Sequence, residues 1–157
     1  MDTLVLHGVR VNLATDSKGV NNWDDLVNSE DKKQNTNQNL PFAALILGGI
    51  NVKDASIRWR DMQQGVEYNI TNTNIHTGEL KLGEPIDITA SSKIAPSKPD
   101  ISSSVQFTGT LSYKDNGDIL ILQPMSLEAV VNGKEIPGSK TLLKLNSEIK
   151  MNFDKNK

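Results

Sequence analysis

Apolar and polar residues alternate along most of this chain, which is the pattern of half-buried β-strands. In VRVNL the apolar positions are Val9, Val11 and Leu13, and a similar alternation fills the last third of the sequence. There, the polar positions of the final run include Lys144, Glu148 and Lys150. The pattern predicts several adjacent strands that form a sheet with one apolar and one polar face.

Turn residues separate these runs. Asn116-Gly117 is a strong hairpin signal between the runs at 101–113 and 119–131, and Pro124 favours either an edge position or a bulge inside the second run. Ile50 and Val52 share one parity, whereas Ala55, Ile57 and Trp59 share the other. This change of parity predicts a turn at Lys53-Asp54 and therefore a hairpin.

Helical signals are few. Residues 21–27, NNWDDLV, predict one short helical turn, and 40–49, LPFAALILGG, predict either a brief helix or the approach to a strand. Residues 28–39 contain no hydrophobic side chain and predict a mobile loop. We therefore expect a mainly β chain, an antiparallel meander with at most one or two short helices, and a single β-rich segment over 1–157.

The composition narrows the possible functions. Only 36% of the 157 residues are hydrophobic and 4% aromatic, which suffices for a sheet that is apolar on one face. The net charge of −2 argues against general nucleic-acid binding, and the lack of cysteine excludes disulfides and thiolate metal sites. No apolar run reaches the roughly 20 residues of a membrane span. The N-terminus also lacks the pattern of a signal peptide, so we expect a piece cut from a longer protein.

Candidate chemistry is sparse. His7 and His76 lack the spacing of a metal site, and neighbouring carboxylates at Asp24-Asp25 suit a helix start. No cofactor, metal or catalytic residue is predicted, and hence no enzyme. Trp59 between two arginines has the local appearance of a nucleic-acid or phosphate contact, and an exposed indole would suit a sugar. Its parity with Ile57 instead favours the apolar face, with the arginines on the opposite face.

Three blocks resemble the AsmA family of bacterial envelope proteins. They are GVRVNLATDSKGVNNWDDL, LILGGINVKDASIRWRD and VEYNITNTNIHTGELKLGEPIDI, and the resemblance covers roughly residues 4–131. The most specific element comprises Gly49-Ile50, Asp54-Ala55, Ile57, Trp59 and Asp61, which is similar to the family's GI-x-I-x-DA-x-I-x-W-x-D pattern. Val52 stands where that pattern often has isoleucine. The resemblance gives Trp59 and Asp61 architectural roles.

The resemblance implies a periplasmic segment of a protein that an N-terminal helix, absent here, anchors to the inner membrane. AsmA proteins and their TamB-like relatives form elongated sheets that curl into an apolar groove. They are implicated in outer-membrane assembly and in phospholipid transport between membranes. The family has no catalytic motif, so no catalytic residue is carried over.

We therefore expect the apolar sheet face to line a lipid groove and to bind phospholipid acyl chains. The candidate residues are Ile57, Trp59, Val105, Phe107, Leu111, Ile119, Ile121, Met125, Leu127, Leu143, Leu145, Ile149 and Met151. Two alternatives remain open. One is a structural module that recruits envelope proteins by strand addition, and the other is a carbohydrate-binding β-sandwich.

Overall fold

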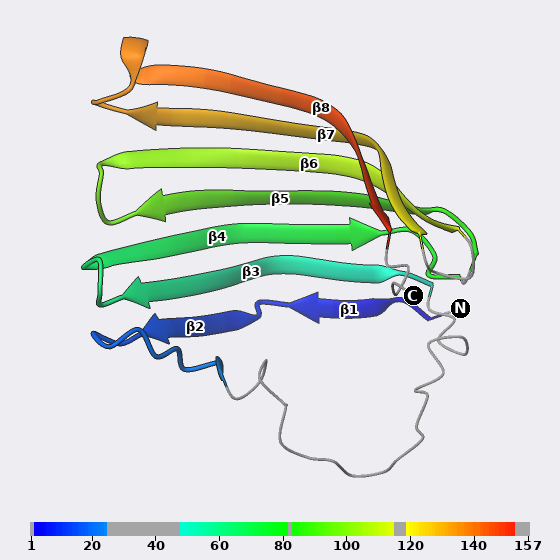
Figure 1. Ribbon diagram of the computed structural model, residues 1–157, viewed down its shortest axis with the longest axis horizontal. Coiled ribbons are helices and arrows are strands. Elements are labelled where there is room, and N and C mark those ends of the chain that lie inside the picture. Colours follow the sequence, from blue (N-terminus) through cyan, green and yellow to red (C-terminus); the bar gives the residue numbers. More distant parts are fainter. Residues whose placement is uncertain (1, 25–47, 82, 115–118, 153–157) are drawn as a thin grey trace.

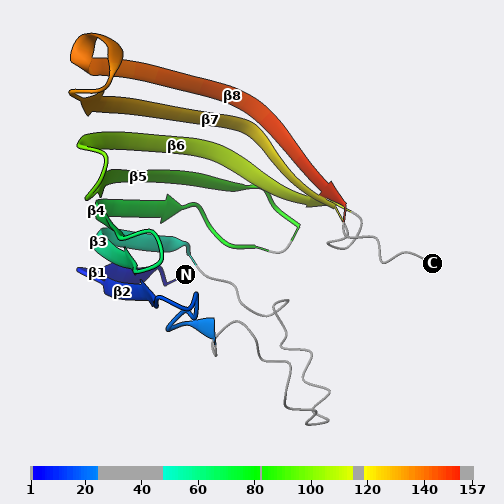
Figure 2. The same cartoon turned by 60° about the vertical axis from the view of Figure 1, so that its left-hand side comes forward.

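The computed structural model describes residues 2–24, 48–81, 83–114 and 119–152, which form a single curled sheet (Figures 1 and 2). The predicted loop at 28–39, most of the run at 40–49 and the predicted turn at Asn116-Gly117 lie outside these residues. The strands are β1 (Leu4–His7), β2 (Arg10–Thr15), β3 (Ile50–Asp61), β4 (Val66–Thr77), β5 (Ile86–Pro96), β6 (Ile101–Lys114), β7 (Ile119–Gly133) and β8 (Lys140–Asn152). A short 3₁₀ turn, η3 (Pro137–Ser139), precedes β8.

The strand order follows the chain from β3 to β8, with each strand antiparallel to the next. Strands β1 and β2 both lie along β3 and pair with it in parallel, one beside each half of its length (Figure 1). The prediction of a mainly β fold with a curled antiparallel sheet is confirmed. No second layer covers the sheet in the part of the chain that the structure describes.

Strand β3 contains a bulge where the sequence predicted a turn. Asp54 has a φ of 52°, and the register with β4 shifts on both sides of Ala55. The backbone N–H of Asp54 donates to Oδ1 of Asn74 at 3.1 Å, so a side chain satisfies the group that the bulge removes from the ladder. The predicted hairpin at Lys53-Asp54 is wrong. The chain reverses only after Asp61, at residues 62–65.

A second bulge lies beside the first, in β4. Asn72 has a φ of 51°, and the register with β5 shifts between Thr71 and Asn74. Residues 66–77 nevertheless form one continuous strand of 12 residues. Because each bulge adds one residue, Ile70 and Ile75 lie on the same face despite their opposite parity.

A third bulge changes the face of two predicted lipid-groove residues. Gly109 pairs with Met125 but Leu111 pairs with Leu122, so β7 has one more residue than β6 across this step. Pro124 lies inside the step, where a residue without an N–H is tolerated, which confirms the bulge suggested by the sequence.

The bulge moves Ile119 and Ile121 away from the apolar face. Ile121 pairs with Ser112 and Lys150, so it shares their face rather than that of Leu127. Ile119 follows the same parity beyond the bulge. The assignment of these two isoleucines to the groove is therefore wrong, and Leu120 and Leu122 take their positions.

Few side chains are buried because the sheet is a single layer. Among the described residues, the buried hydrophobic ones are Ala55, Ile86, Ile121 and Met125, and none is below 2% exposed. The exposed large apolar residues are Leu4, Val5, Leu6, Val11, Val20, Met62, Tyr113, Leu142, Leu143, Leu145, Ile149 and Met151. Hydrogen bonding between strands, rather than a closed core, therefore defines this fold. No helix in the described parts of the chain has the length and hydrophobicity needed to cross a bilayer.

Among the described glycines, Gly49 leaves the least room for an added Cβ, and it lies where the chain enters β3. Its φ is +121°, and a Cβ there would lie 2.6 Å from the carbonyl oxygen of Thr77. We expect Gly49→Ala to lower the free energy of unfolding by about 2 kcal/mol or more, since the strain and the clash add. Urea denaturation measures this loss.

Gly65→Ala is the matched control. Gly65 also has a positive φ, +63°, but nothing lies within 4 Å of a Cβ added there. Gly65→Ala should therefore lower the free energy of unfolding by only about 1 kcal/mol, through backbone strain. Equal losses in the two variants would contradict the role assigned to the close approach at Gly49.

Candidate functional site

One row of apolar residues crosses the sheet from edge to edge. Strand pairing places them directly opposite one another in seven successive strands. This central row consists of Leu6, Val52, Ile75, Ala90, Phe107, Leu127 and Leu145. The row is half-buried in the middle of the sheet and exposed at both edges. Its six interstrand spacings give a length of about 29 Å.

Further apolar rows extend this face along the strands. Ile86, Leu111, Leu122 and Ile149 form one row on β5 to β8, and Val105, Ala129 and Leu143 form another. On the N-terminal strands, Val11, Ile57, Ile70 and Ile94 continue the face on β2 to β5. We call this surface the apolar face, and the opposite side of the sheet the polar face.

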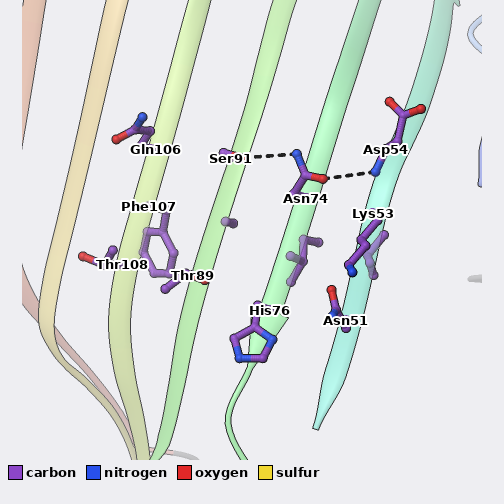
Figure 3. Close-up of a pocket in the computed structure, with 13 residues that line it drawn as sticks. Asn51, Lys53, Asp54, Asn74, His76, Thr89, Ser91, Gln106, Phe107 and Thr108 are labelled. Carbon is purple, nitrogen blue, oxygen red and sulfur yellow. Dashed lines mark hydrogen bonds between the residues drawn. The ribbon is translucent and has the colours of Figure 1, made fainter. Parts of the chain in front are cut away.

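A shallow hollow lies over the middle strands and has a volume of about 440 Å³. Val52, Ile75, Ala90 and Phe107, four consecutive members of the central row, contribute to its lining. Figure 3 is a close-up of this hollow and labels Phe107 among the residues that line it. Ala90 has the smallest side chain of the row and lies between two large neighbours. Its small volume leaves space between Ile75 and Phe107.

Eleven of the thirteen predicted groove residues share the apolar face, since Ile119 and Ile121 are the two exceptions. That these residues contact a lipid stays a prediction. The sequence reasoning missed Leu6, Val52, Ile75 and Ala90 as members of the same surface. Their alternation with polar neighbours was visible, but only the register across β1, β3, β4 and β5 aligns them with Phe107.

Charged side chains gather on the polar face. Arg58 and Arg60 both contact Glu67, each at 3.3 Å. Farther along the sheet, the Lys144 ammonium donates to Glu128 at 2.6 Å. The two arginines therefore pair with a carboxylate on the face opposite Trp59, as the alternation predicted.

Trp59 is the centre of an aromatic cluster at one corner of the apolar face. Its ring stacks on Tyr68 at a centroid distance of 5.1 Å and meets the edge of Trp23 at 6.4 Å. The indole Nε1 donates to Oγ1 of Thr15 at 3.1 Å, and that hydroxyl donates to Asn21 at 2.8 Å. These contacts tie β2 and the following turn to β3, which is an architectural role.

The same corner contains a carboxylate that holds the segment after β2. Asp24 accepts hydrogen bonds from the side chain and the backbone N–H of Asn21, both at 2.9 Å. These bonds favour the charged carboxylate and lower the pKa of Asp24. Asp24 therefore stabilises the turn at Asn21, and the rest of the helical turn predicted at 21–27 lies outside the described residues.

Asp61 closes the turn between β3 and β4. Its side chain is buried, and Oδ1 accepts the backbone N–H groups of Gln63 at 2.9 Å and Gln64 at 3.0 Å. A carboxylate at this position satisfies two donors that the turn leaves without backbone partners.

The described residues contain no group of three or more acidic, histidine or cysteine side chains that could hold a metal ion. His7 pairs with Lys53, and His76 pairs with Asn51. The apolar face is therefore the candidate functional surface among the described residues.

We expect Asp61→Ala to lower the free energy of unfolding by about 2–4 kcal/mol, because two N–H groups lose a charged acceptor in a buried turn. Asp61→Asn keeps an acceptor oxygen and should lose less than half of that amount. Thermal or urea unfolding of both variants tests this. A similar loss in both would mean that the negative charge, and not the acceptor geometry, matters.

The comparisons with known proteins agree with the resemblance in the sequence. A model of the AsmA family matches residues 1–155, whereas no curated protein and no solved structure matches the chain. AsmA is a family of envelope proteins, which indicates an envelope-related role. Since the match covers nearly the whole sequence, the chain belongs to the AsmA family.

Proposed function

We propose that this chain is a non-catalytic segment of a periplasmic envelope protein, and that its apolar face binds the acyl chains of phospholipids. In this role the face lines part of a groove along which lipid moves between membranes during outer-membrane assembly. The full-length protein is anchored to the inner membrane. The observation that carries the proposal is the central row, which is apolar in all seven strands and has no second layer over it among the described residues.

The energetics favour an apolar ligand on this surface. Leu6 and Leu145, at the two ends of the central row, are 39% and 50% exposed. Apolar area left in water is unfavourable by about 25 cal/mol per Å², and each methylene that a ligand buries contributes about 0.8 kcal/mol. Several methylenes on this face therefore supply a substantial binding energy without any polar contact.

The dimensions also suit an acyl chain. One leaflet of hydrocarbon is about 15 Å thick, half of a core of about 30 Å. Strands about 4.8 Å apart mean that three or four strands support one chain. The hollow at Ala90 lies on four neighbouring strands, β3 to β6, and gives the chain a shallow seat in the middle of the face.

The described residues do not support the alternative of a carbohydrate-binding β-sandwich. A sandwich has a second sheet over its apolar face, and the described residues form one sheet. A sugar platform needs an open indole, and Trp59 is packed against both Trp23 and Tyr68.

Photo-crosslinking in the intact envelope tests the lipid-binding proposal. A photoreactive residue at Phe107, Leu127 or Leu122 should capture phospholipid, because these side chains share the apolar face. The same residue at Thr110, Lys144 or Ile121 should capture much less, since the register turns those positions to the polar face. Mass spectrometry of the adducts measures the difference.

The neighbouring positions Ile121 and Leu122 make the sharpest comparison. Alternation without a bulge predicts capture at Ile121, and the bulge at Pro124 predicts capture at Leu122. Equal capture on both faces, or none on either, would contradict a lipid-binding face.

Filling the hollow should weaken binding without unfolding the sheet. Ala90→Leu adds a half-exposed branched side chain between Ile75 and Phe107 and displaces about two ligand methylenes. At about 0.8 kcal/mol each, this should raise the dissociation constant of a fluorescent phospholipid roughly tenfold. Lys93→Leu, on the polar face of the same strand and outside the lining of the hollow, is the control and should leave affinity unchanged. If Ala90→Leu leaves the dissociation constant unchanged, the hollow is not part of the binding surface.

A further inference from the structure

Positive charge gathers on the polar face where β2, β3 and β4 lie side by side, beyond the bulges of β3 and β4. We call this region the basic patch, and it comprises the polar-face positions within residues 10–14, 56–60 and 67–71. Its charged residues are Arg10, Arg58, Arg60 and Glu67. Three cations thus accompany one carboxylate, although the whole chain has a net charge of −2. Such a local excess of positive charge attracts an anion.

A hollow with a volume of about 430 Å³ lies in the basic patch. Six of the nine residues that line it occupy polar-face positions, two on each of the three strands. They are Arg10, Asn12, Ser56, Arg58, Asn69 and Thr71. Guanidinium, amide and hydroxyl groups, all of which donate hydrogen bonds, therefore surround one small space.

Both arginines of the hollow keep donors that no described contact uses. Arg10 is exposed, and its side chain forms no hydrogen bond or ion pair with the described residues. Arg58 contacts Glu67 through Nε at 3.3 Å, so this contact leaves its two terminal nitrogens available to a ligand. Glu67 also contacts Arg60 at 3.3 Å, which means that two guanidinium groups share a single carboxylate. Glu67 therefore orients Arg58 without neutralising the basic patch.

The spacing of the two arginines suits one small anion. Arg10 lies opposite Ser56, and Arg58 follows two residues farther along β3. With about 4.8 Å between strands and about 3.3 Å per residue, the Cα atoms of the two arginines are roughly 8 Å apart. Two arginine side chains at this spacing can donate to different oxygens of the same group. A phosphate group presents more acceptor oxygens than a carboxylate does, so the several donors around the hollow favour a phosphate.

We propose that this hollow binds a phosphate group, carried by a lipid headgroup or by a free phosphate. Arg10 and Arg58 hold the phosphate from β2 and β3 through charge-assisted hydrogen bonds. The hydroxyl of Ser56, which no described residue engages, donates to the same phosphate. The site lies on the face opposite the one proposed for acyl chains, so the inference does not rest on that proposal.

Isothermal titration calorimetry with inorganic phosphate, at constant low ionic strength, tests this site. Arg10→Gln and Arg58→Gln should each raise the dissociation constant at least about tenfold, because each removes a charge-assisted hydrogen bond to the phosphate. Lys134→Gln is the matched control, since it removes one positive charge at an exposed residue outside the hollow. In this control the dissociation constant should change less than about twofold.

Arg10→Lys separates a shaped site from a general positive field. Lysine keeps the charge but lacks the planar fork of donors, so the dissociation constant should rise roughly threefold to tenfold. The Arg10 side chain has no partner among the described residues, so neither substitution at this position should alter the strand content measured by circular dichroism.

Two titrants distinguish a lipid headgroup from a free phosphate. Glycerophosphoglycerol, the deacylated headgroup of phosphatidylglycerol, has a phosphodiester but no acyl chain, so the apolar face contributes nothing to its binding. Tighter binding of this diester than of inorganic phosphate assigns the hollow to a headgroup, and the opposite order assigns it to a free phosphate. A failure of acyl-chain binding on the apolar face leaves both results unchanged.

Three results would overturn the proposal. One is the absence of saturable binding of either titrant up to millimolar concentrations. Another is a loss of affinity in Arg10→Gln and Arg58→Gln that is no greater than the loss in Lys134→Gln. The third is an unchanged dissociation constant in Arg10→Lys, which indicates attraction by charge alone.

Discussion

The structure depends on the alternation of side chains across a single hydrogen-bonded sheet. In a strand, one residue of slip exchanges the two faces, so every apolar residue depends on the register of its neighbours. Here the register aligns apolar residues over seven strands, from Leu6 to Leu145. With no described residue below 2% exposed, backbone pairing and one-sided packing take the place of an enclosed core.

The three bulges preserve this alignment over strands of 12 to 15 residues. Asp54 and Asn72 introduce an extra residue into adjacent strands, so β3 and β4 change parity together. The step around Pro124 does the same for β7 against both β6 and β8. Bulges also bend a strand and increase its twist. The bulges that keep the apolar residues on one face therefore also curl the sheet.

The sequence predicts the local pattern well and the pairing less well. Period-two alternation identifies most strands, Pro124 identifies a bulge, and the parity of Trp59 separates it correctly from Arg58 and Arg60. The change of parity at Asp54 was interpreted as a turn because a turn and a bulge produce the same local pattern. Only the partner strand distinguishes them, and that information is not local.

For the candidate site, too, the sequence predicts the positions within a strand better than the pairing between strands. Eleven predicted positions share the apolar face because alternation holds within each of their strands. Ile119 and Ile121 fail because they lie beyond a bulge whose extra residue the sequence alone does not count. The parallel pairing of β1 with β3, which brings Leu6 into the central row, joins segments more than forty residues apart. No periodicity within either segment indicates that contact.

Gly49, Asp54 and Asp61 of the family pattern lie where the backbone geometry is demanding, whereas Ile57 and Trp59 of the same pattern lie on the apolar face. Gly49 permits a close approach to Thr77, Asp54 occupies a bulge, and Asp61 closes a turn. Each position demands a particular side chain, whereas an apolar face demands only hydrophobicity and volume. Gly49, Asp54 and Asp61 therefore identify the scaffold. Differences in ligand preference between such proteins should then arise at positions such as Ala90, where a change in volume alters the surface and leaves the backbone unchanged.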